Sequence, residues 1–229
     1  MSRAPALPTS FTEGGWRQVR TQTKEELTLP AFSIRSHSRL YEHVETAEAL
    51  QVVSGADLDM PPRAVFTTVL EFAPSFADVG VDPDAGPVFA VARRQARNEF
   101  ARSVREDGLV SVERTDARWL DRDDGTSARA FRYDVTFPLS PEAVDGDSRQ
   151  PTLRGVLWAA IWPTDRTYAM AGGIYPAESL DAALDRQGAT LALDIDGRAD
   201  DGAGPTVDVD RATHRQVLTR AVRSAGLVG

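Results

Sequence analysis

GVLWAAIWPTDRTYAMAGGIYP, residues 155–176, is the most apolar stretch of this chain. Its longest apolar run is the eight residues 155–162, whereas a membrane-spanning helix needs about 20. A polar break at 163–166 separates two short apolar runs, and this pattern predicts a β-hairpin. Because the runs are apolar at both odd and even positions, we expect two central strands that are covered on both faces.

A second hairpin is predicted just before this stretch, in LVSVERTDARWLDRDDGTSARAFRYDVTFPL, residues 109–139. The Asp-Gly pair at 124–125 favours a type I′ turn, and apolar and polar residues alternate along the return strand. Folding the strands about this turn places Val112 on the buried face and Trp119 on the other. Either Trp119 covers that second face, or a bulge near 115–117 shifts the register.

Helical periodicity predicts three helices in the chain. Residues 87–108 are amphipathic, with a proline in the first turn and a glycine where the helix stops. A second helix is expected at 176–188, and a third closes the chain at 208–226. Either Asp208 or Asp210 caps the closing helix, since a carboxylate accepts hydrogen bonds from the first free backbone N–H groups.

The rest of the chain divides into a tail and a single domain. Residues 1–14 contain prolines and no apolar run, and we expect them to form a flexible N-terminal tail. Residues 16–46 are polar but strand-like, and 63–74 are rich in β-branched and aromatic residues, which favours another strand. No repeat, linker or low-complexity block interrupts 15–229, so these residues are predicted to form one domain.

This order of elements predicts an α+β fold in which helices cover a central antiparallel sheet. The segment from Pro87 to Gly188, with the stretches RGVLWAAIW and TYAMAGGIYP, resembles the Mog1/PsbP-like fold, an α/β/α sandwich. Members of that family act as protein-binding modules or photosystem accessory subunits, mostly without catalysis. The resemblance implies a binding function, but it carries over no binding residue, because no functional motif of the family is present.

The charge composition is unusual. Acidic residues outnumber basic ones 34 to 26, which gives a net charge of −8, and Lys24 is the only lysine. This bias resembles that of halophilic, haloarchaeal proteins, because molar salt shortens the reach of carboxylate repulsion to ~3 Å. A bacterial gene rich in G and C also replaces lysine by arginine, so both origins stay open. In either case an acidic surface argues against DNA, RNA and anionic membrane lipids as partners.

Several protein classes are disfavoured by what the sequence lacks. It has no cysteine, which rules out disulfides, thiolate nucleophiles and thiolate metal sites. The first 16 residues show no apolar run of the kind found in secretory signals, so we expect a cytoplasmic protein. No G-x-S-x-G, P-loop or dinucleotide-binding motif occurs, and no cofactor is expected.

Histidines and aspartates offer only weak candidates for a metal site. His37 and His43 share one side of a strand but lie ~20 Å apart, and His214 falls on the closing helix among arginines. Two aspartate-rich loops, 121–126 and 194–204, depart from the calcium-loop pattern in the places of their glycines and glutamates. We therefore expect no metal.

Five aromatic residues form the candidate binding site. They are grouped in and before the central hairpin, and they would line an apolar pocket or a protein-docking patch if helices left part of the sheet open. Burial in the core is the other explanation of the same cluster. The five are Trp119, Trp158, Trp162, Tyr168 and Tyr175.

Two functions are compatible with these features. The first is a non-catalytic binding or accessory domain, for a protein partner or an apolar small molecule, that uses the aromatic cluster. The second is an enzyme whose acid–base groups are carboxylates such as Asp165 or Asp134, beside Arg132 or Arg166. The first predicts an open apolar surface near the central hairpin, and the second predicts a cleft in which carboxylates converge.

The predicted helix at 87–108 also carries a row of arginines. They could face a phosphate group, or they could form a solvated flank that pairs with the many carboxylates of the chain. These arginines are Arg93, Arg94, Arg97, Arg102 and Arg105.

Overall fold

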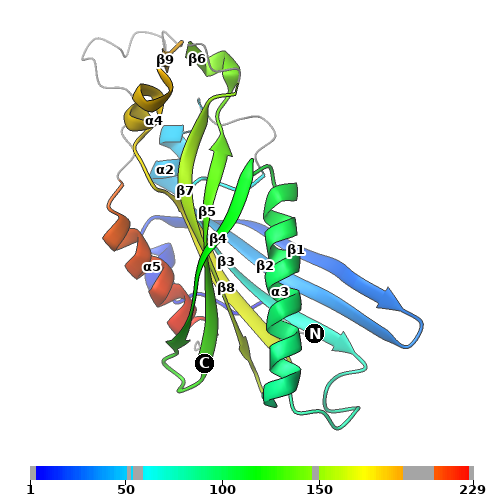
Figure 1. Ribbon diagram of the computed structural model, residues 1–229. Coiled ribbons are helices and arrows are strands. Elements are labelled where there is room, and N and C mark those ends of the chain that lie inside the picture. The colour runs from blue at the N-terminus through cyan, green and yellow to red at the C-terminus, as the bar shows by residue number, and fades with distance from the viewer. Residues whose placement is uncertain (1–3, 51–52, 54–58, 146–149, 193–208, 227–229) are drawn as a thin grey trace.

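The computed structural model describes residues 4–50, 53, 59–145, 150–192 and 209–226. The described residues contain nine strands: β1 (Trp16–Leu29), β2 (Phe32–His43), β3 (Ala64–Ala73), β4 (Ser111–Asp121), β5 (Ser127–Pro138), β6 (Val144–Asp145), β7 (Thr152–Pro163), β8 (Tyr168–Pro176) and β9 (Thr190–Leu191). Seven of them form one antiparallel sheet in the order β1-β2-β3-β8-β7-β5-β4, and β6 pairs with β9 (Figure 1). This sheet is the centre of the molecule.

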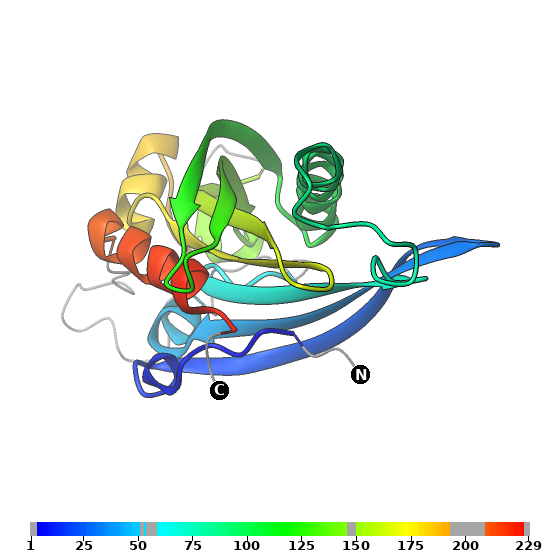
Figure 2. The ribbon, with the colours of Figure 1, turned by 90° about the horizontal axis from the view of Figure 1, so that it is seen from below.

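Helices pack on both faces of the sheet, which confirms the predicted α+β class. The sheet is curled, with α3 inside the curl and α5 on its outer face (Figure 2). Within the described ranges, no helix has the length and apolarity needed to cross a membrane. The helices are α1 (Thr9–Thr12), α2 (Val44–Leu50), α3 (Gly86–Glu106), α4 (Leu180–Gln187) and α5 (Arg211–Ser224), with a short 3₁₀ helix, η1 (Pro141–Ala143).

Each face of the sheet has its own hydrophobic core. On the inner face, Phe89 and Val104 of α3 belong to one cluster with strand residues such as Phe131 and Ile161. On the outer face, Leu218 of α5 comes so close to β8 that a Cβ atom on Gly173 would lie 2.5 Å from it. The cluster on this face also contains the strand alanines Ala128, Ala130, Ala160, Ala169 and Ala171.

The stretch 155–176 forms the β7–β8 hairpin, as predicted. Strand β7 lies between β5 and β8, and β8 lies between β7 and β3, so both strands are central. Every residue of β8 is buried, and so is every residue of β7 from position 155 onward. At Gly172 the neighbouring backbone comes so close that a Cβ atom would lie 2.0 Å from the carbonyl oxygen of Trp158.

The β4–β5 hairpin forms at the predicted place, but its turn and register differ from those expected. A type I′ turn needs positive φ at both central residues, and here only Gly125 has one, at +81°. The type I′ prediction is therefore wrong. Of the two explanations left open for Trp119, the bulge is the correct one: a register shift between Arg114 and Asp116 places Trp119 on the same face as Val112.

The N-terminal segment from Ala4 to Phe11 packs against the sheet through Leu7 and Phe11 and does not form the flexible tail that the sequence predicts. Leu7 and Phe11 are buried in the core of the outer face. Thr67 Oγ1 donates a hydrogen bond of 2.6 Å to the carbonyl oxygen of Pro5, and the Thr67 side chain is fully buried. The apolar residues of this segment are too few to give a periodic pattern, yet the outer face of the sheet provides a surface for each of them.

The polar stretch 16–46 is not one continuous strand. It forms the β1–β2 hairpin, which turns at Pro30, and then enters α2. The hairpin extends past the rest of the sheet (Figure 1), because β3 pairs with β2 as far as Ala73 but with β8 only as far as Val69. A long, largely polar ribbon therefore projects from one side of the molecule.

Candidate functional site

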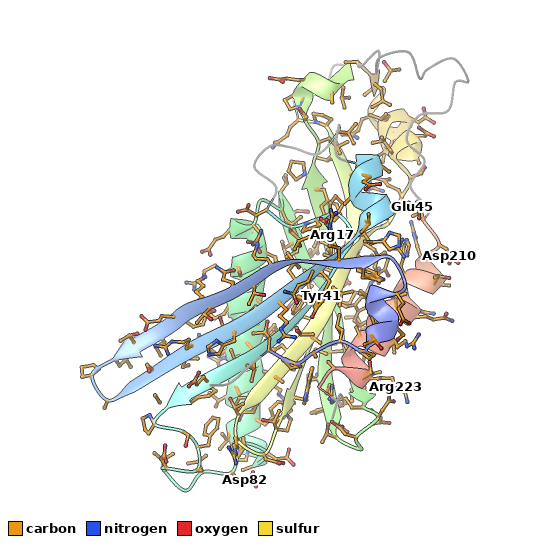
Figure 3. The ribbon with its side chains drawn as sticks, turned by 180° about the vertical axis from the view of Figure 1, so that it is seen from behind. Arg17, Tyr41, Glu45, Asp82, Asp210 and Arg223 are labelled. Atoms are coloured by element: carbon orange, nitrogen blue, oxygen red, sulfur yellow. The ribbon has the colours of Figure 1, made fainter. Side chains whose placement is uncertain are left out.

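A groove of about 810 Å³ lies on the outer face, between the first turns of α5 and strands β4, β5, β7 and β8. In Figure 3 the labels Asp210 and Arg223 mark the two ends of α5. Asp210, one of the two predicted caps, accepts hydrogen bonds from the N–H groups of Ala212 and Thr213. The groove is lined by Ser111, Glu113, Asp116, Arg118, Arg132, Asp134, Val135, Thr136, Arg154, Gly155, Val156, Trp158, Tyr175, Ala177, Arg211, Ala212 and Arg215.

The floor of the groove is aromatic. Trp158 of β7 and Tyr175 of β8 are 9% and 5% exposed. The guanidinium carbon of Arg118 lies 4.6 Å from the centre of the Trp158 ring, and the Tyr175 ring lies 5.2 Å from the ring of His214 on α5. Burial raises the pKa of Tyr175, an effect that Trp158 and neighbouring arginines partly offset, so its hydroxyl is neutral near pH 7.

Five arginines and three carboxylates surround this floor. Arg132 forms an ion pair of 3.0 Å with Asp134, and Arg211 Nε donates a hydrogen bond of 2.8 Å to the carbonyl oxygen of Ala177. Within the part of the chain that the structure describes, the other three arginines have no ion-pair partner. These three, which we call the rim arginines, are Arg118 on β4, Arg154 on β7 and Arg215 on α5.

The backbone of Arg154 binds one further carboxylate, that of Glu178. The Arg154 N–H donates a hydrogen bond of 3.0 Å to Glu178 Oε1, and Arg186 forms an ion pair of 2.7 Å with the same oxygen. Burial favours a higher pKa for Glu178, but the hydrogen bonds from Arg186 and the Arg154 N–H lower it below the usual value. Glu178 thus stays ionised and bound to Arg186, while the guanidinium of Arg154 makes no ion pair with it.

The carboxylates of the enzyme hypothesis do not converge. Asp134 lies in the groove, where it pairs with Arg132, and both side chains are substantially exposed. Asp165 and Arg166 lie in the exposed turn between β7 and β8. Asp134 pairs with Val156 of β7, and the end of that strand is ~23 Å further along. The two aspartates therefore cannot act on one substrate atom.

The sheet divides the five predicted aromatic residues. Trp158, Trp162 and Tyr175 lie in the core of the outer face, whereas Tyr168 lies in the core of the inner face. Trp119 is also on the inner face and is 50% exposed. They are not a single cluster, because side chains that alternate along a strand point to opposite faces.

Only two of the five aromatic residues, Trp158 and Tyr175, line the groove. Trp162 is covered by the guanidinium of Arg122, whose central carbon is 3.8 Å from the ring centre. Tyr168 is fully buried, and its hydroxyl donates a hydrogen bond of 2.9 Å to the carbonyl oxygen of Pro83. Trp162 and Tyr168 therefore have structural roles.

The histidines lie in three separate places. His37 Nε2 is 2.7 Å from Glu71, the ring of His43 packs edge-on against Trp16, and His214 is buried on α5. Among the described residues, no three groups of the kinds that ligate metals come together. Residues 121–126 form the end of β4 and the β4–β5 turn. The loop 194–204 lies outside the described residues.

The arginines of α3 have several different environments. Arg102 forms ion pairs with glutamates of the same helix, and Arg105 donates hydrogen bonds to the carbonyl oxygens of Ala101 and Val112. Arg93 and Arg97 instead lie on the side of the helix that faces β4 and β5. The helix is thus neither a uniform solvated flank nor a single phosphate site.

Sequence reasoning missed the rim arginines. The spacing of Arg154, Val156 and Trp158, which are two residues apart on β7, places all three side chains on the same face of the sheet. This spacing could have predicted an arginine beside the aromatic floor. No local pattern connects these residues with Arg118 or Arg215, which are distant in the sequence and meet them only in the folded chain.

Comparison with known proteins gives a family but no activity. No curated protein and no solved structure matches the chain. One family model matches residues 4–220, and its description is "Domain of unknown function (DUF6517)". The match extends from the N-terminal segment into α5, so it includes every strand described above and all the helices except the end of α5. This chain therefore belongs to the DUF6517 family.

Proposed function

We propose that this protein is a non-catalytic binding domain whose groove takes a small molecule with an anionic group attached to an apolar, planar part. The observation that carries this proposal is the position of the three rim arginines around Trp158 and Tyr175. A guanidinium group binds a carboxylate or phosphate with two parallel hydrogen bonds. The small exposed part of the aromatic floor, over which the guanidinium of Arg118 also lies, offers an apolar contact beside the rim arginines.

The charge of the groove supports an anionic ligand. Its lining has five arginines and three carboxylates, whereas the whole chain has a net charge of −8. A purely apolar ligand, one of the two partners expected from the sequence, would leave the two-charge excess of arginine over carboxylate in the groove lining unmatched. An anionic group on the ligand provides the counter-charge and an orientation for the apolar part.

The volume of the groove is that of a site for a small molecule rather than for a protein partner. Its volume of about 810 Å³ falls within the range of small-molecule sites, ~300–1,000 Å³. The resemblance of residues 87–188 to Mog1/PsbP-like domains points to binding without catalysis as well. Acid–base catalysis by Asp134 is the second candidate, because it also lies in the groove, but an exposed carboxylate already paired with Arg132 is a weak general base.

The groove is tested with anilinonaphthalene sulfonate and its uncharged counterpart, N-phenylnaphthylamine, which share an aromatic system and differ in the anionic group. We expect the sulfonate to bind at least about tenfold more tightly, which corresponds to about 1.4 kcal/mol. The double variant Arg154→Ala/Arg215→Ala should remove most of this preference, since it deletes two of the rim arginines. Fluorescence titration of the folded protein measures both affinities.

The matched control for this experiment is Arg166→Ala, which removes one arginine from the exposed β7–β8 turn, away from the groove. It should leave the preference for the sulfonate unchanged. Equal affinities for the two probes would overturn the anionic part of the proposal. A preference that survives in the double variant would move the site away from the groove.

We also propose that the protein is halophilic, on the basis of its single lysine and its excess of carboxylates. Raising KCl from about 0.1 M to about 1 M shortens the screening length from ~10 Å to ~3 Å and weakens the repulsion between carboxylates. The melting temperature, followed by circular dichroism, should therefore rise by at least about 5 °C, equivalent to about 1–2 kcal/mol. A melting temperature independent of KCl would favour the bacterial alternative.

A further inference from the structure

A second basic surface lies on the inner face of the sheet, on the opposite side from the groove. It is formed where α3 passes next to the edge strand β4 and its neighbour β5. We call it the basic seam. Its members are Arg93 and Arg97 of α3, Arg114 and Trp119 of β4, and Arg129 of β5.

Trp119 is the exposed aromatic residue of the basic seam. The guanidinium carbons of Arg93 and Arg129 lie 5.8 Å and 5.4 Å from its ring centre, and Phe89 lies 6.1 Å away on the core side. Half of the Trp119 side chain remains accessible to solvent. An accessible indole held in place by two arginines is a rigid contact surface for an apolar side chain.

The arginines of the basic seam make no ion pair with any carboxylate in the described ranges. None of the four forms an ion pair within the described residues, although carboxylates outnumber basic groups in this chain. Arg97 donates its hydrogen bonds to the neutral side chain of Asn98. Arg102, on another side of the same helix, shows the contrast, because it contacts the carboxylates of Glu99 and Glu106. The positive charge of the seam is therefore not neutralised locally.

A buried hydroxyl group lies beneath the same seam. Tyr133 of β5 pairs with Arg114 of β4, and its side chain is 2% exposed. Its hydroxyl has no hydrogen-bond partner among the described residues. Burial raises the pKa of Tyr133 to about 12, against the opposing effect of Arg97, Arg114 and Arg105, which shows that these charges lie near the hydroxyl. The three cations therefore gather over this part of β5, while the hydroxyl itself is too deeply buried to contact a ligand on the surface.

The length of the basic seam shows what kind of ligand it fits. Arg114 and Trp119 are five residues apart on β4, a distance of ~16 Å along an extended strand. A single carboxylate or phosphate can contact only one end of such a row. An extended polypeptide with several carboxylates can contact all of it, and one apolar side chain of that polypeptide can reach Trp119.

We propose that the basic seam binds an extended acidic segment of a partner protein, with one apolar residue of that segment placed on Trp119. Charge complementarity with four arginines that form no ion pair among the described residues supports this occupant. A nucleic acid is also polyanionic, but the net charge of −8 repels a long phosphate backbone that extends past the seam. The basic seam and the groove lie on opposite faces of the sheet, so disproving a ligand in the groove would not disprove a partner on the seam, and the reverse is also true.

The probe is a fluorescein-labelled peptide of three Glu-Glu-Leu repeats, and its binding is measured by fluorescence anisotropy. KCl is kept at the lowest concentration at which the circular dichroism spectrum equals that in molar KCl. We expect saturable binding that the double variant Arg97→Glu/Arg114→Glu weakens by at least about tenfold. Trp119→Ala should weaken it by about tenfold as well, because it removes the apolar contact.

The matched control is the double variant Arg94→Glu/Arg166→Glu, which makes the same charge change at two exposed positions outside the seam. It should change the affinity by less than about threefold, whereas equal weakening by both double variants would show a general charge effect and overturn the proposal. Absence of peptide binding would overturn it too, as would loss of binding in Arg154→Ala/Arg215→Ala. Tighter binding of a thymidine oligonucleotide than of the peptide would assign the seam to nucleic acid.

Discussion

Gly172→Ala is expected to lower the free energy of unfolding by about 3 kcal/mol or more, because the central sheet has no room for one methyl group. The added Cβ would lie 2.0 Å from the carbonyl oxygen of Trp158 and 2.9 Å from the Cα of Ala159. Both are backbone atoms, and β8 cannot shift to relieve the overlap, since it is bonded to β3 on one side and β7 on the other. Urea unfolding followed by circular dichroism measures the change.

Gly86→Ala is the matched control for this substitution. Gly86 is the first residue of α3, its φ is not positive, and no atom outside its chain neighbours Ala85 and Pro87 lies within 4 Å of the position that a Cβ would take. Because a proline disfavours a helical residue with a Cβ just before it, we expect the same added methyl group to cost about 1 kcal/mol, well below the cost of Gly172→Ala. Equal unfolding midpoints for the two variants would contradict the close approach of β7 and β8.

Arg122→Ala is expected to lower the free energy of unfolding by about 3–5 kcal/mol. The Arg122 side chain is 2% exposed, donates hydrogen bonds to the carbonyl oxygens of Val222 and Ala225, and forms an ion pair of 3.0 Å with Asp124. Its guanidinium also covers the ring of Trp162. Removing it leaves two carbonyl groups at the end of α5 without a donor and opens a cavity above the indole.

Arg122→Lys separates charge from geometry at the same site. Lysine keeps the charge but lacks the planar fork that serves several acceptors at once, so we expect it to recover less than half of the lost stability. Arg223→Ala is the control, because Arg223 pairs with Asp123 at 2.9 Å while 49% of its side chain is exposed. That variant should cost less than about 1 kcal/mol. Full recovery by lysine would show that the hydrogen bonds to α5 contribute little.

Much of the architecture could be predicted from the sequence, because local patterns dictate it. The β7–β8 hairpin follows from two apolar runs around a polar break, and α3 from apolar residues at helical spacing. The helix α4 starts at its capping Ser179 and ends at Gly188, whose φ of +61° only glycine adopts easily. In each case the residues that form the element also carry the signal for it.

The register between β4 and β5 could not be predicted, because one extra residue in a strand changes the partner of every residue that follows it. The bulge after Arg114 shifts every later residue of β4 relative to β5. It thereby moves Trp119 from one face of the sheet to the other. The alternation of apolar and polar residues cannot reveal such a bulge. After the extra residue the alternation continues, but each later side chain points to the opposite face of the sheet.

The candidate site was predicted only in part for a related reason. Their aromatic character and their place in the central hairpin predict a site at Trp158 and Tyr175, and both line the groove. The same features predict a site at Trp162, yet Arg122 covers it within the core of the outer face. What distinguishes them is the position of α5, whose last turns cover the sheet while its first turns leave the groove open. The packing of a helix from the far end of the chain decides this.

The pairing of the N-terminal segment with α5 has a consequence for synthesis. Ribosomes release a chain from its N-terminus onward, whereas Gly226 donates its N–H to the carbonyl oxygen of Ala6, and Arg220 donates to Ser10. An early segment and a later helix thus cover the same face of the sheet. While α5 is still inside the ribosome, only the N-terminal segment covers that face, and a chain truncated before Arg211 leaves much of its apolar surface exposed and prone to aggregation.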